Sequence, residues 1–242
     1  MSEKLKRLAD RVEERFGATL VRLPSLHHEL GYELSAAQLL DVCAALRDED
    51  GFRFEQLIDI CGLDHLTYGS DEWVTEDATD TGFSRGVNRE IPDQEPNYDR
   101  RFAVVYHLLS VTLNHRIRLK VFCDAGDPPI VPSVDGIWSA ANWFEREAFD
   151  MFGIVFDGHP DMRRILTDYG FVGHPFRKDF PLSGHVEVRF DPEKGRVVYQ
   201  PITIERRILV PKVIRHDHRY NERLDHQTDV APKTETEKSG NA

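Results

Sequence analysis

The first third of the chain alternates between helical and extended apolar patterns. Leu5, Leu8, Val12 and Phe16 recur at the three- and four-residue spacing of one helix face, and Gly17 ends the pattern. The other elements expected in this region are short strands at residues 19–23, 29–34 and 54–61, and a helix that is capped by Ser35, carries Leu39, Leu40, Cys43 and Leu46, and ends near Gly51.

Two strongly strand-like stretches follow a polar insertion. Residues 101–110 and 116–124 are rich in β-branched and aromatic side chains, and a turn near Asn114 separates them, so they are predicted to pair as a hairpin. The preceding residues, 67–100, hold nine acidic and three basic side chains without a sustained period, which indicates a surface insertion. Helices mixed with antiparallel strands predict an α+β domain with a small mixed sheet over residues 1–124.

A long helix is predicted between Trp138 and Gly153, with apolar side chains all around it. A helix that is apolar on every side is normally buried. Gly153 stands just after the periodic residues, where helices commonly end in a left-handed residue. The apolar residues of this helix are Ile137, Trp138, Ala141, Trp143, Phe144, Ala148, Phe149, Met151 and Phe152.

Charged residues interrupt this apolar helix, and each needs a partner. Three acids and one base, Glu145, Glu147, Asp150 and Arg146, cannot all pair within the helix, although Arg146 and Asp150 are four residues apart and within reach of each other. A buried charge is costly unless it is paired and hydrogen-bonded. We therefore expect the helix and the following loop to form one charge-paired unit packed beneath another surface. The loop supplies His159, Arg163, Arg164, His174, Arg177 and Lys178.

The C-terminal part reads as extended chain. Residues 186–190 alternate as a strand, a Gly- and Pro-containing turn follows, and residues 197–210 continue extended. Such a segment has little periodicity with which to build its own core, so we expect it to pack on partner subunits, with a disordered tail at its end. The expected organisation is an α+β domain at 1–124, a connector, helix and loop at 125–185, and an extended segment at 186–242.

Composition and charge exclude several classes of protein. The 242 residues are 40% hydrophobic and 30% charged, which is ordinary for a soluble protein, and the net charge of −11 argues against binding to nucleic acid or anionic lipid. Apolar runs are too short for a membrane span, and the N-terminus lacks a signal or transit pattern, which points to a bacterial-type cytosolic protein. Cys43, Cys61 and Cys123 are widely separated, unlike the ligands of iron–sulfur or zinc sites.

Two kinds of catalytic site compete with a structural role. His159, His174 and His185, with Asp161 or Asp179, offer metal-ligand chemistry, but their spacing fits no short ligand motif and basic residues flank them. We instead expect each Gly-His-Pro triplet to form a fixed turn whose imidazole bridges backbone to a carboxylate. The carboxylates Glu145, Glu147 and Asp150 suggest acid–base catalysis, but nearby arginines would hold them ionised, so salt-bridged structure is favoured.

The spacing of these residues resembles a known family. Glu145-Arg146-Glu147, Asp150-Met151-Phe152, His159, Arg163 and Ile165-Leu166, followed by Gly173-His174-Pro175 and the run from Arg177 to Leu182, are similar to the signature of the C subunit of proton-pumping NADH:quinone oxidoreductase, respiratory complex I. In mitochondria the equivalent is usually called the 30 kDa subunit. The match is dense over the middle and later part of the chain and general in the N-terminal part.

The resemblance implies a cofactor-free, non-catalytic subunit of the peripheral arm at the cytoplasmic face of the bacterial inner membrane. FMN and iron–sulfur clusters would lie in partner subunits, and the partners would be the quinone-site (D, 49 kDa-type) subunit and iron–sulfur subunits. The alternative is the equivalent component of a related membrane-bound hydrogenase or ferredoxin-linked complex. The expected interface residues are Glu145, Arg146, Glu147, Asp150, Phe152, Gly153, His159, Pro160, Arg163, Arg164, Gly173, His174, Pro175, Arg177, Lys178 and Asp179.

Overall fold

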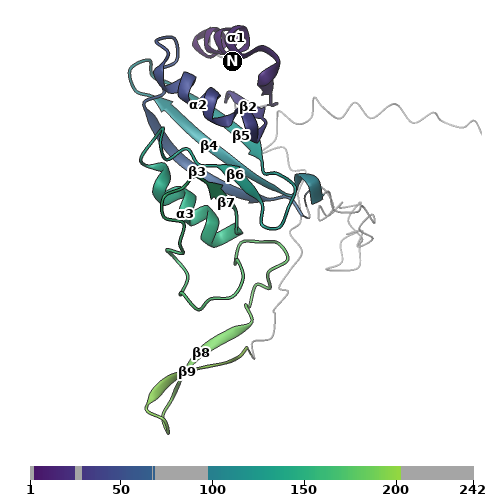
Figure 1. Ribbon diagram of the computed structural model, residues 1–242, viewed down its shortest axis with the longest axis vertical. Coiled ribbons are helices and arrows are strands. Elements are labelled where there is room, and N and C mark those ends of the chain that lie inside the picture. Colours follow the sequence, from purple (N-terminus) through teal and green to yellow (C-terminus); the bar gives the residue numbers. More distant parts are fainter. Residues whose placement is uncertain (1–2, 25–28, 67, 69–97, 203–242) are drawn as a thin grey trace, which may run out of the picture. The chain divides into compact units, whose positions relative to one another are not determined.

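The structure is a computed structural model that describes residues 3–24, 29–66, 68 and 98–202 (Figure 1). All of these residues belong to one compact unit. Within them, no helix combines the length and the apolar character that crossing a membrane would require. Most of the expected insertion and all of the expected disordered tail lie outside the described residues.

A five-stranded mixed sheet forms the centre of the fold. The strand order is β1-β2-β5-β4-β3, in which β2 and β5 are parallel and the other pairs are antiparallel. The α+β class predicted from the sequence is thereby confirmed, as is the hairpin of β4 and β5, which closes at the pair Ser110 and His115. The strands are β1 Val21–Arg22, β2 Gly31–Leu34, β3 Gln56–Asp64, β4 Phe102–Ser110 and β5 His115–Phe122.

One face of this sheet, the inner face, carries the hydrophobic core. Alternate residues of the strands, such as Tyr32, Tyr106 and Leu119, point into it because side chains of a strand alternate between its two sides. The helices α1 (Glu3–Phe16) and α2 (Leu39–Asp48) add their apolar stripes to the same core. The short 3₁₀ turns are η1 (Gly17–Thr19), η2 (Ala36–Gln38) and η3 (Tyr98–Arg100).

Two details of the second helix differ from the sequence-based expectation. Ser35 makes no capping hydrogen bond to the backbone, because the η2 turn intervenes and its hydroxyl donates to the side chain of Gln38 instead. Leu40 is 42% exposed, since the core-facing stripe runs through Leu39, Val42, Cys43 and Leu46.

Helix α3 (Ala141–Phe152) packs on the same core. It has 12 residues and begins three residues later than Trp138, so it is shorter than the long helix that was expected. The backbone N–H of Trp138 donates to Val134 in a preceding turn, and the indole Nε1 donates to Phe54 O at 3.0 Å, which fixes Trp138 outside the helix. Gly153 ends α3 at φ +74°, as predicted.

Two small pairs of strands complete the described chain. β6 (Ile130–Pro132) and β7 (Val155–Asp157) flank α3 in sequence and pair in parallel. β8 (Val186–Asp191) and β9 (Arg196–Pro201) form an antiparallel hairpin, which agrees with the extended pattern and turn expected there. Between β7 and β8 the chain forms a loop without regular secondary structure, over residues 158–185.

The contact between α3 and β3 depends on a glycine. A methyl group at Gly62 would lie 2.5 Å from Cδ2 of Phe152, which is far too close. We expect Gly62→Ala to lower the free energy of unfolding by about 1–3 kcal/mol, because the aromatic ring must shift within a packed site. Gly136→Ala is the matched control, since open space surrounds that position. Urea unfolding of both variants measures the difference, and equal stabilities would contradict this packing.

Candidate functional site around helix α3

The carboxylate of Asp150 organises the loop that follows α3. It is fully buried and accepts hydrogen bonds from the Arg164 guanidinium at 2.8 Å and from the backbone N–H groups of Ile165, Leu166 and Thr167 at 3.1, 2.7 and 2.9 Å. The Thr167 hydroxyl donates to it at 2.5 Å. Burial alone would raise the pKa of Asp150, but these donors outweigh it and hold the pKa well below the usual range.

Arg164 connects this carboxylate to a second part of the loop. Besides its ion pair with Asp150, its Nη2 donates to Gly173 O at 2.9 Å, and its Nη1 contacts the Thr167 hydroxyl at 3.1 Å. One planar guanidinium with several donors can join such separate acceptors, which a lysine cannot do with the same geometry. The loop from Ile165 to Gly173 is thereby fixed at both ends.

A second buried carboxylate, on Asp64 at the end of β3, fixes the later part of the loop. Arg101 binds it through Nε and Nη2, both at 3.0 Å, and the backbone N–H of Lys178 donates to it at 2.8 Å. Arg101 also pairs with Asp179 at 2.9 Å. Burial acts to raise the pKa of Asp64, but the bonds from Arg101 and the backbone lower it overall. Asp64 was not among the residues predicted from the sequence, because it lies 114 positions before Lys178 and no local pattern marks it.

The last turn of α3 is capped from the same loop. The backbone carbonyl of Phe152 accepts from Arg177 Nε at 2.6 Å, and that of Asp150 contacts His174 Nδ1 at 3.0 Å. These side chains satisfy C-terminal carbonyls that have no partner inside a helix, where a positive charge is also favourable. A Cβ on Gly153 would lie 2.5–2.6 Å from both side chains, so this position needs glycine for space as well as for its positive φ.

Arg146 faces away from Asp150, although their spacing of four residues puts them within reach of each other. Its guanidinium hydrogen-bonds the side-chain oxygen of Asn142, lies over the ring of Trp143 at 4.5 Å, and contacts Asp161 at 3.9 Å. Asp150 points instead to the loop donors described above. The helix is therefore joined to the loop on two sides by different charged residues.

The two Gly-His-Pro triplets form turns with a positive φ at glycine, as expected, but their imidazoles bind backbone groups. Nδ1 of His159 accepts from the backbone N–H of Asp161 at 3.0 Å, so its Nε2 carries the hydrogen donated to Asn142 O at 3.2 Å. His174 contacts a backbone carbonyl as well. The prediction that each imidazole contacts a carboxylate is wrong, because the imidazoles contact backbone carbonyls at the two ends of α3 instead. Gly158 and Gly173 have φ of +83° and +96°.

Glu145 contradicts the expectation that every buried acid of α3 has a basic partner. Its carboxylate is fully buried and accepts from the Ser133 hydroxyl at 2.6 Å and from the Val134 N–H at 2.7 Å. It points to the end of β6 rather than to the loop. Burial raises the pKa of Glu145 to about 7, against the opposing effect of these two donors.

The other predicted residues lie around this unit. Phe152 packs on Gly62 and edge-on against Phe176 at 5.7 Å. Glu147 is exposed, and Arg163 pairs with Asp161 in an exposed ion pair at 3.0 Å. Within the described ranges, no three His, Cys, Asp or Glu side chains come together in a group that could hold a metal. Of the remaining predicted residues, Pro175 is partly buried, and Pro160, Lys178 and Asp179 are exposed.

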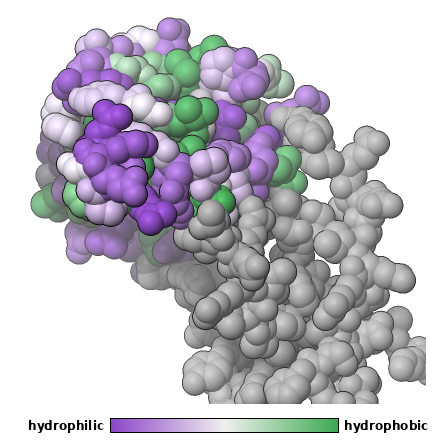
Figure 2. Space-filling view, turned by 90° about the horizontal axis from the view of Figure 1, so that it is seen from below, coloured by the Kyte–Doolittle hydropathy of each residue, from purple (hydrophilic) through white to green (hydrophobic). Residues whose placement is uncertain are grey.

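The fixed loop presents apolar side chains at its surface. Loop surfaces are usually polar, because removing apolar groups from water lowers the free energy. Here hydrophobic groups lie among hydrophilic ones on the side of the molecule shown in Figure 2. The large exposed apolar residues of α3 and the loop are Trp143, Leu166, Tyr169, Val172, Phe176 and Leu182.

The β8–β9 hairpin has one apolar side, which we call the hairpin face. Cross-strand pairs on this side include Val188 with Tyr199 and Phe190 with Val197, and the same side carries Val186. These five side chains are 55–71% exposed. The other side is mostly polar and carries Glu187, Arg189, Asp191, Arg196, Val198 and Gln200.

We expect Asp150→Asn to lower the free energy of unfolding by about 3 kcal/mol, because it removes one partner of a buried ion pair and turns an amide toward backbone donors. Arg163→Ala is the control, since its exposed ion pair with Asp161 contributes about 0–1 kcal/mol. Urea unfolding at pH 7 compares the two variants with the parent. Similar losses in both would show that Asp150 does not organise the loop.

Glu145 predicts a specific pH dependence. Because its folded-state pKa is raised, the folded protein keeps a proton that the unfolded chain loses, so this group lowers stability as pH rises from 5 to 8. Glu145→Gln cannot titrate. The free energy of unfolding of the Glu145→Gln variant, minus that of the parent, should therefore increase as pH rises over this range, by on the order of 3 kcal/mol. A difference that stays constant with pH, in urea unfolding series, would contradict the assignment.

Comparisons with known proteins show the family of this chain. Residues 32–186 match the family described as respiratory-chain NADH dehydrogenase, 30 Kd subunit. The C subunit of NADH-quinone oxidoreductase from Coxiella burnetii (strain RSA 493 / Nine Mile phase I) is 56% identical over 221 residues, which cover 91% of this chain and 96% of that protein. The protein of the same name from Halorhodospira halophila is 55% identical over 225 residues, covering 88% and 92%.

A chain of the membrane-bound sulfane sulfur reductase, an archaeal respiratory membrane complex, shares the fold. Its TM-score is 0.52 at 21% identity, and the match covers 74% of this chain and 87% of that one. The family match spans β2 to the start of β8 and includes α3 and its charge-fixed loop. The chain therefore belongs to the respiratory-chain NADH dehydrogenase 30 kDa subunit family, as a relative of the bacterial NADH-quinone oxidoreductase C subunits.

Proposed function

We propose that this chain is a structural, cofactor-free subunit of proton-pumping NADH:quinone oxidoreductase. It supports electron transfer from NADH through FMN and iron–sulfur clusters to quinone by holding neighbouring subunits in position. The redox groups belong to other subunits of the peripheral arm. Relatives that are 53–56% identical are named as the C subunit of NADH-quinone oxidoreductase, which supports this complex over a related hydrogenase.

The observation that carries the proposal is the exposed hairpin face. An isolated two-stranded hairpin is at best marginally stable in water, and this one exposes an unbroken row of apolar side chains on one side. Contiguous exposed apolar surface typically marks an interaction site. The hairpin face therefore fits a surface that becomes buried against another subunit, with Phe190 and Tyr199 as aromatic anchors.

The loop after α3 is the second part of the proposed interface, and the buried charges around α3 make it rigid. Asp150 and Asp64 fix the loop from within, so the apolar side chains on its outside are presented in one arrangement. A preorganised surface loses little conformational entropy when a partner binds. We assign the loop and the hairpin face to the quinone-site (D, 49 kDa-type) subunit and the iron–sulfur subunits, at the cytoplasmic face of the inner membrane.

The assignment also fits the chemistry of the buried carboxylates. Asp150 already accepts five hydrogen bonds, and its lowered pKa makes it a poor general base. Glu145 is enclosed by Ser133 and Val134 and has no exposed surface. In this proposal both carboxylates act by positioning backbone segments.

Phe190→Asp together with Tyr199→Asp tests the proposal. We expect the amount of assembled complex recovered from membranes through a tag on this chain to fall at least tenfold, because burying one aromatic side chain contributes about 1.5–3 kcal/mol. The NADH:quinone activity of each complex that still assembles should remain unchanged. Native gels, quantitative mass spectrometry and NADH:quinone assays measure these quantities.

Arg189→Ser is the matched control, because Arg189 lies on the other side of the same strand. It should leave the amount of complex unchanged. The isolated double variant should unfold within about 0.5 kcal/mol of the parent, since both substituted side chains are exposed. A normal amount of complex in the double variant would refute the assignment of the hairpin face.

A further inference from the structure

The second side of the five-stranded sheet, the outer face, differs from the inner face in its chemistry. Because strand residues alternate, β5 turns Ile117, Leu119 and Val121 to the core and the residues between them outward. Those intervening residues are Arg116, Arg118 and Lys120. Three successive outward positions of one strand are thus basic, in a chain whose net charge is −11.

The acidic residues of the outer face only partly balance this charge. Arg118 pairs with Glu29 at 3.7 Å and Arg100 with Glu33 at 2.6 Å. The ammonium of Lys120 contacts Nε2 of His65 at 3.1 Å. Partial burial and the neighbouring cations Arg100 and Arg118 lower the pKa of Lys120, against the effect of Glu33. Burial is the main cause of this shift, because it disfavours the charged ammonium.

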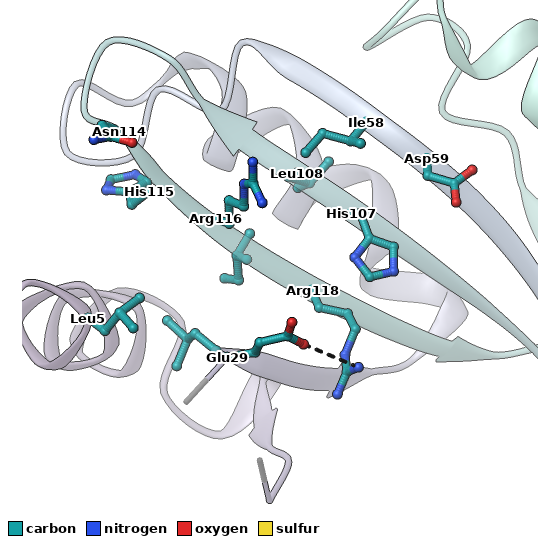
Figure 3. Close-up of a pocket in the computed structure, with 12 residues that line it drawn as sticks. Leu5, Glu29, Ile58, Asp59, His107, Leu108, Asn114, His115, Arg116 and Arg118 are labelled. Carbon is teal, nitrogen blue, oxygen red and sulfur yellow. Dashed lines mark ion pairs between the residues drawn. The ribbon is translucent and has the colours of Figure 1, made fainter. Parts of the chain in front are cut away.

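A groove lies on the outer face near the turn between β4 and β5. Its volume is about 640 Å³. Figure 3 shows His107, Arg116 and Arg118 beside it, with Glu29 next to Arg118. Ile58 on the neighbouring strand β3 lines it as well and is 37% exposed. Arginine guanidinium groups beside an apolar side chain suit a peptide that carries both carboxylate and apolar side chains.

The chemistry of the groove favours protein over a phosphate polymer or a lipid surface. Ile58 lines the groove beside the arginines, and a phosphate backbone has no apolar side chain that could cover it. The overall charge of −11 also repels extended polyanions and anionic membranes at long range. A short acidic peptide segment needs only the two or three local cations.

We propose that the groove on the outer face, with Arg116 and Arg118 at its centre, binds an acidic segment of a neighbouring polypeptide. The carboxylates of that segment pair with the two guanidinium groups, and its apolar side chains cover Ile58. This surface is separate from the hairpin face and from the loop after α3, and it gives the chain a second, charge-based contact.

The test uses the full chain in its assembled state. The photo-crosslinker p-benzoylphenylalanine replaces Ile58 in one chain, and Lys194 or Tyr199 in two separate chains. Each assembly is irradiated and recovered through a tag, and the linked peptides are identified by mass spectrometry. We expect position 58 to link to a peptide of another polypeptide that has at least three acidic residues, and position 194, exposed in the turn between β8 and β9, not to reach that peptide. Position 199 reports hairpin docking independently, so the failure of one proposal is distinguishable from the failure of the other.

Charge reversal then tests the chemistry. Arg116→Glu should lower the yield of the position-58 adduct at least fivefold, and changing an acidic residue of the linked peptide to lysine in the same cells should restore it. Lys194→Glu is the control and should leave the yield unchanged. Adducts with residues 69–97, with nucleic acid or with lipid, a non-acidic peptide, no adduct at all, or no response to charge reversal would each overturn the proposal.

Discussion

The fold around α3 depends on how buried charges are neutralised. A carboxylate removed from water is tolerated only when donors replace the lost hydration, and Asp150 obtains five of them from a loop 14 to 17 residues away in sequence. The donors include three consecutive backbone N–H groups, so the carboxylate determines the path of the main chain there. The loop is consequently ordered by an acid inside the protein rather than by an apolar core of its own.

The second buried carboxylate, Asp64, extends this arrangement to the sheet. Arg101 joins it to Asp179 in the loop, while Arg177 from the same loop caps α3 and lies over the ring of Phe102. Sheet, helix and loop are therefore connected by cations that each contact two elements. Such connections are directional, unlike apolar contacts, and they fix the orientation of the loop as well as its distance from the sheet.

The loop after α3 is polar on its inside and apolar on its outside, which is the reverse of an ordinary loop. The inside of the 158–185 loop is rich in hydrogen-bonded charge, and its outside carries aromatic and aliphatic side chains. The hairpin that follows repeats this asymmetry, with one apolar side and one mostly polar side. This distribution is expected for a chain that completes its hydrophobic burial in an assembly, and it agrees with membership of a family of respiratory-complex subunits.

The sequence by itself determined the α+β class, the β4–β5 hairpin, the left-handed end of α3 at Gly153 and the need for charge neutralisation around α3, because these follow from local periodicity and from the residue types within one segment. Only the tertiary structure decided which charges meet. Asp64 and Lys178 are far apart in the chain, Arg146 contacts Asn142 instead of pairing with Asp150, and Glu145 has a hydroxyl and a backbone N–H in place of a base. Charge pairing depends on distances set by the packing of strands and helices that are remote in sequence, and a spacing of four residues shows only which partners are within reach.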